Sequence, residues 1–181
     1  MAKLSGRAWC ARFSTSTSVA DLVEPFRTGV SHFLAALKVA GAEYSISATF
    51  RPPERAYLMH WAWMIAQGGA MPGAVPPMAG VDIDWTHCGD VTAARTAAKE
   101  MVAGYGIQYQ PSLTSRHCEH RAIDMRIRWN GTLAMRTASG AAVKIATMPR
   151  NGDNRDLQAV AAGFGVHKLV SDPPHWSDDG H

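Results

Sequence analysis

The stretch AIDMRIRW, residues 122–129, has the most regular pattern in the chain and decides the fold class. Its odd-numbered residues are apolar, and from Asp124 onward its even-numbered residues are charged. Because successive side chains of a strand point to opposite faces, the pattern predicts a half-buried β-strand. Asp124 is then expected to point away from the core.

Outside this strand, the sequence predicts several further short strands and a set of amphipathic helices. Asn130-Gly131 is a strong hairpin signal, with the return strand at residues 133–135 and further strands at 44–50 and 143–146. Apolar spacing, proline and capping residues predict helices at residues 19–37, 54–67, 91–103 and 153–164. Asp90 and Asp153 are expected to open the last two helices, Gly41 to follow the first, and Gly104 to end the third. We therefore expect an α+β fold, a small antiparallel sheet flanked by helices.

Length and composition indicate one ordinary globular domain. The chain has 181 residues, of which 46% are hydrophobic and 18% charged. A chain of this size buries enough apolar surface to fold without disulfides. We expect a single domain over residues 1–181, with residues 1–18 loosely ordered. The glycine- and proline-rich residues 68–80 are expected to form a loop or lid.

Charge, cysteine content and the lengths of the apolar runs indicate where the protein is made and which partners it lacks. The net charge is +3, and three cysteines without CxxC spacing predict free thiols. No signal peptide or transmembrane segment is evident, so we expect the protein to be made in the cytoplasm. We also expect it to be a monomer. Four arginines near the central strand lack interleaved aromatic residues, so we expect no nucleic-acid partner. These are Arg116, Arg121, Arg126 and Arg128.

The candidate chemistry resides in His117, Asp124 and His175. Two imidazoles and one carboxylate form a three-ligand set that leaves a fourth position of zinc open, whereas structural zinc sites close the shell, often with cysteines. On one helix, His117 and Asp124 would lie about 10 Å apart. We therefore place His117 on a turn or a strand edge before the strand of Asp124, with the zinc site at one face of the sheet.

The second motif is Asp172-Pro173-Pro174-His175-Trp176. Two prolines favour polyproline II, whose three-residue repeat would direct Asp172 and His175 to the same side. Trp176 is expected to pack in the core. A second possible cluster, His87 with Asp82 and Asp84, alternates like an exposed strand and is the weaker candidate for a metal site.

These motifs resemble those of the D-Ala-D-Ala metallopeptidase (LAS) superfamily. Residues 115–124 read Ser-x-His followed by Ala-x-Asp, and the second motif resembles the Asp-x-Pro-His-aromatic ending of its members. The residues Phe164-Gly165-Val166 and Ser47 to Pro52 resemble two further segments of phage endolysins in that superfamily. Those endolysins cleave the L-alanyl-D-glutamate bond of peptidoglycan stem peptides. The resemblance extends over roughly residues 45–176.

The resemblance implies a zinc peptidase that acts on peptidoglycan stem peptides after release from the cell. In this reading His117, Asp124 and His175 bind Zn²⁺, Asp172 is the catalytic base, and Arg51 and Ser115 contact the substrate. Zinc would lower the pKa of its bound water to about 7. The Arg51 guanidinium suits a substrate carboxylate or a developing oxyanion.

The chain departs from the resemblance at His120, where the family usually has glycine. His120 could constrain the loop, crowd the metal or offer a spare ligand. Two other functions stay open. One is a D-Ala-D-Ala carboxypeptidase that trims terminal D-alanine. The other is a non-catalytic peptidoglycan-binding module of a phage particle, in which His120 would be the change that removed the activity.

Overall fold

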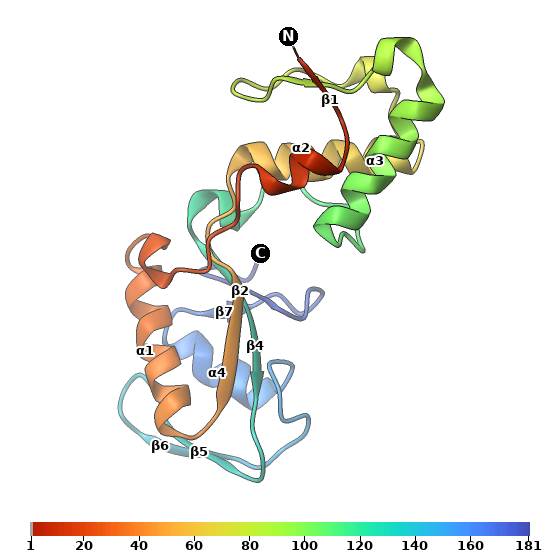
Figure 1. Ribbon diagram of the computed structural model, residues 1–181. Helices are drawn as coiled ribbons and strands as arrows, with labels where there is room; N and C mark the ends of the chain where they lie inside the picture. The colour runs from red at the N-terminus through yellow and green to blue at the C-terminus, as the bar shows by residue number, and fades with distance from the viewer. Residues whose placement is uncertain (1) are drawn as a thin grey trace. The chain divides into compact units, whose positions relative to one another are not determined.

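The computed structural model describes residues 2–181, and within them the fold is α+β with four α-helices and small β-sheets (Figure 1). The chain divides into two compact units. Unit 1 contains residues 2–14 and 51–115, and unit 2 contains residues 15–50 and 116–181. Each unit has its own apolar core, so each is described by itself. The single peptidase domain over residues 1–181 stays a prediction.

Unit 1 is mostly helical, and its core is built around Trp9, Leu58 and Met101. The residues expected to be loosely ordered contain a short strand and a 3-10 helix, and Trp9 is 2% exposed. Residues 68–80 form the expected loop apart from one short 3-10 helix. The elements of unit 1 are β1 (Lys3–Leu4), which pairs in parallel with β3 (Ile83–Asp84), η1 (Arg7–Ala11), α2 (Pro53–Ala66), η3 (Pro72–Ala74), η4 (His87–Gly89) and α3 (Val91–Tyr105).

The two ends of α3 show which glycine ends the helix. At its start the Asp90 carboxylate accepts a hydrogen bond from the backbone N–H of Ala93 at 2.9 Å, as predicted. Gly104 does not end the helix, because it lies inside it, where an added Cβ would be 2.7 Å from the Cys10 sulfur. The left-handed cap is Gly106, with φ of 67°. Gly104 thus allows close packing against Cys10, and Gly106 ends the helix.

Unit 2 contains a four-stranded antiparallel sheet in the order β2, β4, β8, β7. A separate pair, β5 and β6, is also antiparallel. The elements of unit 2 are η2 (Val19–Asp21), α1 (Phe26–Val39), β2 (Glu43–Ala48), η5 (Arg116–Glu119), β4 (Ala122–Arg128), β5 (Leu133–Arg136), β6 (Ala142–Ile145), α4 (Arg155–Gly163), β7 (His167–Lys168) and β8 (His175–Ser177).

The alternation read from residues 122–129 is confirmed by the burial of β4. Ile123, Met125 and Ile127 are at most 3% exposed and belong to the core of unit 2. Both α1 and α4 contribute side chains to this core, so they cover the same face of the sheet (Figure 1). Arg126 and Arg128 are exposed on the other face. The sheet therefore has one apolar face and one polar face.

The predicted hairpin at Asn130-Gly131 is wrong. Gly131 does adopt the left-handed conformation of a turn, with φ of 64°, but β4 pairs with β2 and β8 rather than with β5. The return strand β5 instead pairs with β6. A turn residue fixes a local change of direction, whereas the choice of partner strand depends on which apolar faces meet in the core.

Two predicted helix starts are also corrected. The first helix begins at Phe26 rather than near Val19, because Pro25 at its N-cap has no N–H to continue a helix from the preceding residues. The fourth helix is capped by Asn154 rather than Asp153. The Asn154 side chain accepts from two backbone N–H groups and donates to the main-chain oxygens of Thr147 and Pro149, so it joins the helix to the preceding loop.

No helix within residues 2–181 has the length and apolar character needed to cross a lipid bilayer.

Candidate metal centre

The pairing of β4 with β8 explains why Asp124 and His175 meet. They are directly opposite each other in the ladder, and the adjacent pair is Ile123 with Trp176. Opposite residues on one face have Cβ atoms about 5 Å apart. Because both strands alternate, the metal-ligand pair lies on the polar face while Trp176, which is 0% exposed, packs in the core as predicted.

His117 reaches the same place from outside the sheet. It lies on the short helix η5, and the chain turns once more before β4 begins, as the sequence predicted. Its Nε2 atom is 3.0 Å from Oδ1 of Asp124, and Nδ1 of His175 is 3.2 Å from the same oxygen. The two imidazole rings are nearly perpendicular, at 83°, with centroids 4.9 Å apart.

The hydrogen bonds behind the two imidazoles determine what they present to Asp124. Nδ1 of His117 is 2.8 Å from the main-chain oxygen of Thr49, and Nε2 of His175 is 3.1 Å from that of His181. A main-chain oxygen can only accept, so each of these ring nitrogens carries the proton. When both imidazoles are neutral, the other nitrogens direct lone pairs at a carboxylate oxygen. In that state the three converging electron pairs need a positive charge between them, which a metal ion or ring protons would supply.

The burial of this group makes the need for a cation stronger. The side chains of His117 and His175 are 1% and 8% exposed, and that of Asp124 is 14% exposed. A buried carboxylate without compensating charge is costly. Burial raises the pKa of Asp124, but hydrogen bonds and charge from His117 and His175 outweigh it and hold that pKa well below its usual range. The site therefore keeps Asp124 ionised.

The spacing of the three ligand atoms suits one small metal ion. All three lie within 4.8 Å of one another, and no other such group of histidine, cysteine or acidic residues occurs in residues 2–181. Two atoms that are each roughly 2.1 Å from a tetrahedral ion would be roughly 3.4 Å apart. Main-chain oxygens behind both imidazoles are the usual partners of metal-binding histidines. This group could thus hold a metal ion through three protein ligands.

Asp172, the predicted base, lies in the turn that leads into β8. The backbone N–H of His175 donates to the main-chain oxygen of Asp172 at 3.0 Å, so these residues close a β-turn. The prediction of polyproline II is therefore wrong, because that conformation has no internal hydrogen bonds. The Asp172 side chain is exposed and accepts no hydrogen bond from any residue within 2–181. Its role as base stays a prediction.

Lys168 is a residue of this region that the sequence did not indicate. Its ammonium donates to the main-chain oxygens of Leu169, Asp172 and His175, and it lies 5.6 Å from the ring centroid of Trp176. Burial lowers the pKa of Lys168, against the opposite effect of nearby carboxylates, Asp124 and Asp172 among them. One lysine thus holds together the turn that delivers His175. Nothing in the spacing of a single lysine signals such a role.

Arg51 and Ser115, the predicted substrate contacts, belong to unit 1. They are the residues at which the chain passes out of unit 2 and back into it, after Phe50 and before Arg116. Both side chains are partly buried. Their contact with substrate stays a prediction.

His120 is not part of the metal-ligand group. Its ring stacks on Phe50, with centroids 3.9 Å apart and planes 3° from parallel, and its Nδ1 lies 2.6 Å from the main-chain oxygen of Asp21. Its φ of 61° is left-handed, a conformation in which glycine has no steric cost. The position thus keeps a glycine-like backbone, and the histidine side chain is accommodated by stacking.

The alternative cluster in unit 1 is not a metal site in this structure. Asp84 accepts from the backbone and hydroxyl of Thr86, and His87 hydrogen-bonds to Ser5 at 2.8 Å. Within the described chain, the group of potential ligands contains neither residue, nor Asp82.

Comparison with known proteins gives no family assignment. No protein-family model matches the chain, and no curated protein matches it significantly. What can be said of its function therefore depends on the residues themselves.

Proposed function

We propose that this protein is a zinc-dependent peptidase that hydrolyses a peptide bond in peptidoglycan stem peptides. The observation that carries the proposal is the convergence of His117 Nε2, Asp124 Oδ1 and His175 Nδ1, with the second nitrogen of each imidazole on a main-chain oxygen. Nitrogen and oxygen ligands in this number are typical of catalytic zinc sites. The resemblance of the surrounding motifs to the LAS superfamily supplies the substrate class.

The open coordination position is what separates this ligand set from a structural one. When bound there, zinc supplies a Lewis acid for the scissile carbonyl and lowers the pKa of water to about 7. His117 and His175 are held in a single tautomer by Thr49 and His181, so their lone pairs face the ion without rearrangement. Asp124 supplies the negative charge of the set.

Asp172 is proposed to move the proton. A general base must be ionised and free to accept, and the exposed Asp172 carboxylate has no competing hydrogen bond within residues 2–181. It takes the proton from the attacking water and gives it to the departing amine. Lys168 fixes the main chain on both sides of this turn, so the position of Asp172 is coupled to that of His175. Arg51 and Ser115 keep their proposed contacts with the substrate.

The test is digestion of purified sacculi by the full-length protein, with soluble products identified by mass spectrometry. Zinc-loaded protein is expected to release stem peptides with new amine ends, and a chelator is expected to abolish the release. Asp172→Asn is expected to lower the rate by about 100- to 10,000-fold while zinc stays bound. Ser171→Ala, in the same turn, is the control and should digest normally.

The other functions give different products. Release of single D-alanine residues would indicate the carboxypeptidase, and binding of sacculi without new amine ends would indicate the non-catalytic module. Normal digestion by Asp172→Asn would remove that residue from the mechanism. Failure of the protein to bind zinc would contradict the whole proposal.

A further inference from the structure

The polar face of the sheet in unit 2 is hollowed into a groove of about 650 Å³. Its floor is the outer part of β4 with β2 beside it, and one wall is formed by residues 151–153. Pro173 and Pro174, which lie in the turn between Asp172 and His175, line the groove along the same edge of β4 as residues 151–153, on the side away from β2. All these residues belong to unit 2.

The groove begins next to the metal-ligand group. Asp124 and Arg126 are two residues apart on β4, so their side chains leave the same face of the sheet, roughly 7 Å apart along the strand. The main-chain oxygen of Pro174 accepts from the N–H of Met125 at 2.8 Å, which closes the wall against the floor just before His175. A peptide bound at the metal ion would enter this groove within one or two residues.

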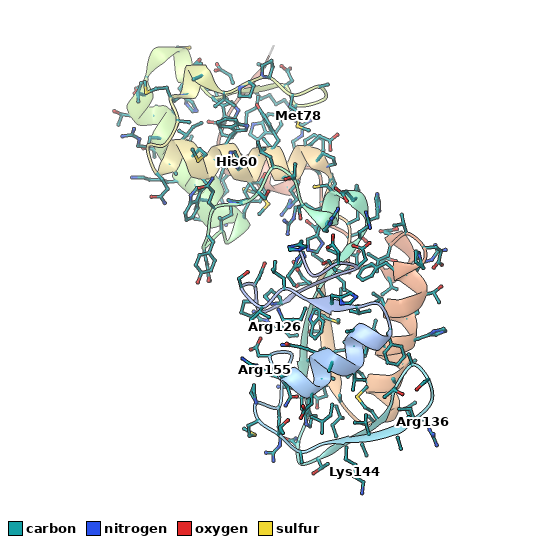
Figure 2. All side chains as sticks on the ribbon, turned by 180° about the vertical axis from the view of Figure 1, so that it is seen from behind. His60, Met78, Arg126, Arg136, Lys144 and Arg155 are labelled. Carbon is teal, nitrogen blue, oxygen red and sulfur yellow. The ribbon has the colours of Figure 1, made fainter. Side chains whose placement is uncertain are left out.

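Arg126 differs from Arg116, Arg121 and Arg128 in having no ion-pair partner within residues 2–181. Arg116 pairs with Glu119 and Asp179, and Arg121 pairs with Asp178. Arg128, the other arginine of the groove, pairs with Glu43 at 2.6 Å. The main chain of Arg126 belongs to the β2–β4 ladder, but its exposed side chain makes neither a hydrogen bond nor an ion pair with any residue from 2 to 181. Figure 2 labels its side chain on unit 2.

The charges around Arg126 select the kind of anion that it can bind. Asp153 and Glu43 also line the groove, so a strongly charged polyanion such as a nucleic acid would meet repulsion there. A single carboxylate fits better, because the planar guanidinium binds it through two parallel hydrogen bonds. Ser45 and Asn151 add neutral polar groups for a peptide backbone.

We propose that Arg126 binds a free carboxylate of the stem peptide, one or two residues from the scissile bond. This inference rests on the proposed function and adds a specificity to it. The protein should cleave a peptide with a free carboxylate one or two residues from the scissile bond better than the same peptide with a carboxamide at that position. Loss of the carboxylate leaves the guanidinium without its anion, so discrimination resides in Arg126 rather than in the metal ion.

The experiment compares two synthetic stem peptides that differ only in this group, carboxylate or carboxamide, as substrates of the zinc-loaded protein. The wild-type protein is expected to prefer the carboxylate by about 10- to 100-fold in kcat/KM, the range of one charged hydrogen-bonded contact. In Arg126→Gln this ratio should fall to about one. Arg126→Lys keeps the charge without the fork and should give an intermediate ratio.

The matched control is Lys144→Gln, which removes the same charge from an exposed position of β6 in the same unit (Figure 2). It should keep the wild-type ratio. Zinc content and the unfolding midpoint of each variant show that the site and the fold are intact. Equal cleavage of both peptides by the wild-type protein, or an unchanged ratio in Arg126→Gln, overturns the inference and leaves the proposed function standing. Cleavage of neither peptide overturns both.

Discussion

The two faces of β4 carry opposite kinds of residue, and each follows a different physical requirement. On the core face, Ile123 and Ile127 are buried against α1 and α4. On the polar face, Asp124 meets His117 and His175, and Arg126 faces the groove. Side chains that are adjacent in sequence thus contribute separately to folding and to the candidate chemistry. Substitutions on the two faces should therefore have separable effects.

The largest effect is expected from the polar face. Asp124→Ala removes the only carboxylate of the ligand group, so zinc binding should be lost and the hydrolysis rate should fall on the order of 1,000-fold or more. Zinc content measured by atomic absorption, together with the digestion rate, checks this. Asp82→Asn, an exposed carboxylate of unit 1, is the control. Loss of zinc in that variant instead would place the site in unit 1.

Substitutions on the core face of β4 should lower the stability of the fold. Ile127→Ala is expected to lower the free energy of unfolding by about 2–5 kcal/mol, because it leaves a cavity in the core, and Ile127→Val by about 0.5–1.5 kcal/mol. The neighbouring Arg128→Ala should cost less than about 1 kcal/mol, since its ion pair with Glu43 is largely exposed. Urea denaturation of the three variants gives the order. A larger loss for Arg128→Ala than for Ile127→Ala would reverse the assignment of the faces.

The ionisation of Asp124 should make the zinc-free protein sensitive to acid. Folding lowers the pKa of Asp124 from about 3.9 in the unfolded chain. The folded protein therefore takes up a proton on this carboxylate only at a lower pH than the unfolded chain does. The stabilisation is therefore complete above about pH 4 and decreases as the pH falls towards the folded-state pKa. Asp124→Asn should lack this dependence. We expect the two unfolding midpoints to converge as the pH falls from 6 to 2.5, and a constant separation would contradict the assignment.

A smaller effect is expected from Lys168, which positions the turn before β8. Lys168→Met keeps much of the apolar packing on Trp176 but removes the donors to the three main-chain oxygens. The zinc affinity should fall about 10-fold, the lower end of what supporting contacts of a metal ligand contribute. Competition with a fluorescent chelator measures it. Lys144→Met is the control, and an equal loss there would deny Lys168 a positioning role.

The parts of the fold that were predictable are those set by local chemistry. The faces of β4, the Asp90 cap and the turn that carries His117 follow from short-range rules, and the structure confirms them. The hairpin at Asn130-Gly131 and the polyproline II form of the Pro-Pro segment were wrong. At the first, β5 pairs with β6, a strand that the local pattern does not specify. At the second, the segment closes a β-turn through a hydrogen bond from the His175 N–H to the main-chain oxygen of Asp172.

The candidate site also contains residues that the sequence indicated and residues that it did not. His117, Asp124 and His175 were predicted from residue type and motif, because a metal ion needs side chains of those kinds. The main-chain oxygens of Thr49 and His181, and the amine of Lys168, gave no signal. Any residue has a main-chain oxygen, so only its position in space makes it a partner.

The sequence by itself determined which side chains face the core and which residues could bind a metal ion, since both follow from side-chain chemistry and a period of two along the strand. Only the tertiary structure decided that Asp124 stands opposite His175, that Arg116, Arg121 and Arg128 form ion pairs whereas Arg126 forms none within residues 2–181, and that Lys168 holds the turn. The physical reason is that strand register and ion pairing depend on distances between residues far apart in the chain. Such distances are set by how the whole core packs.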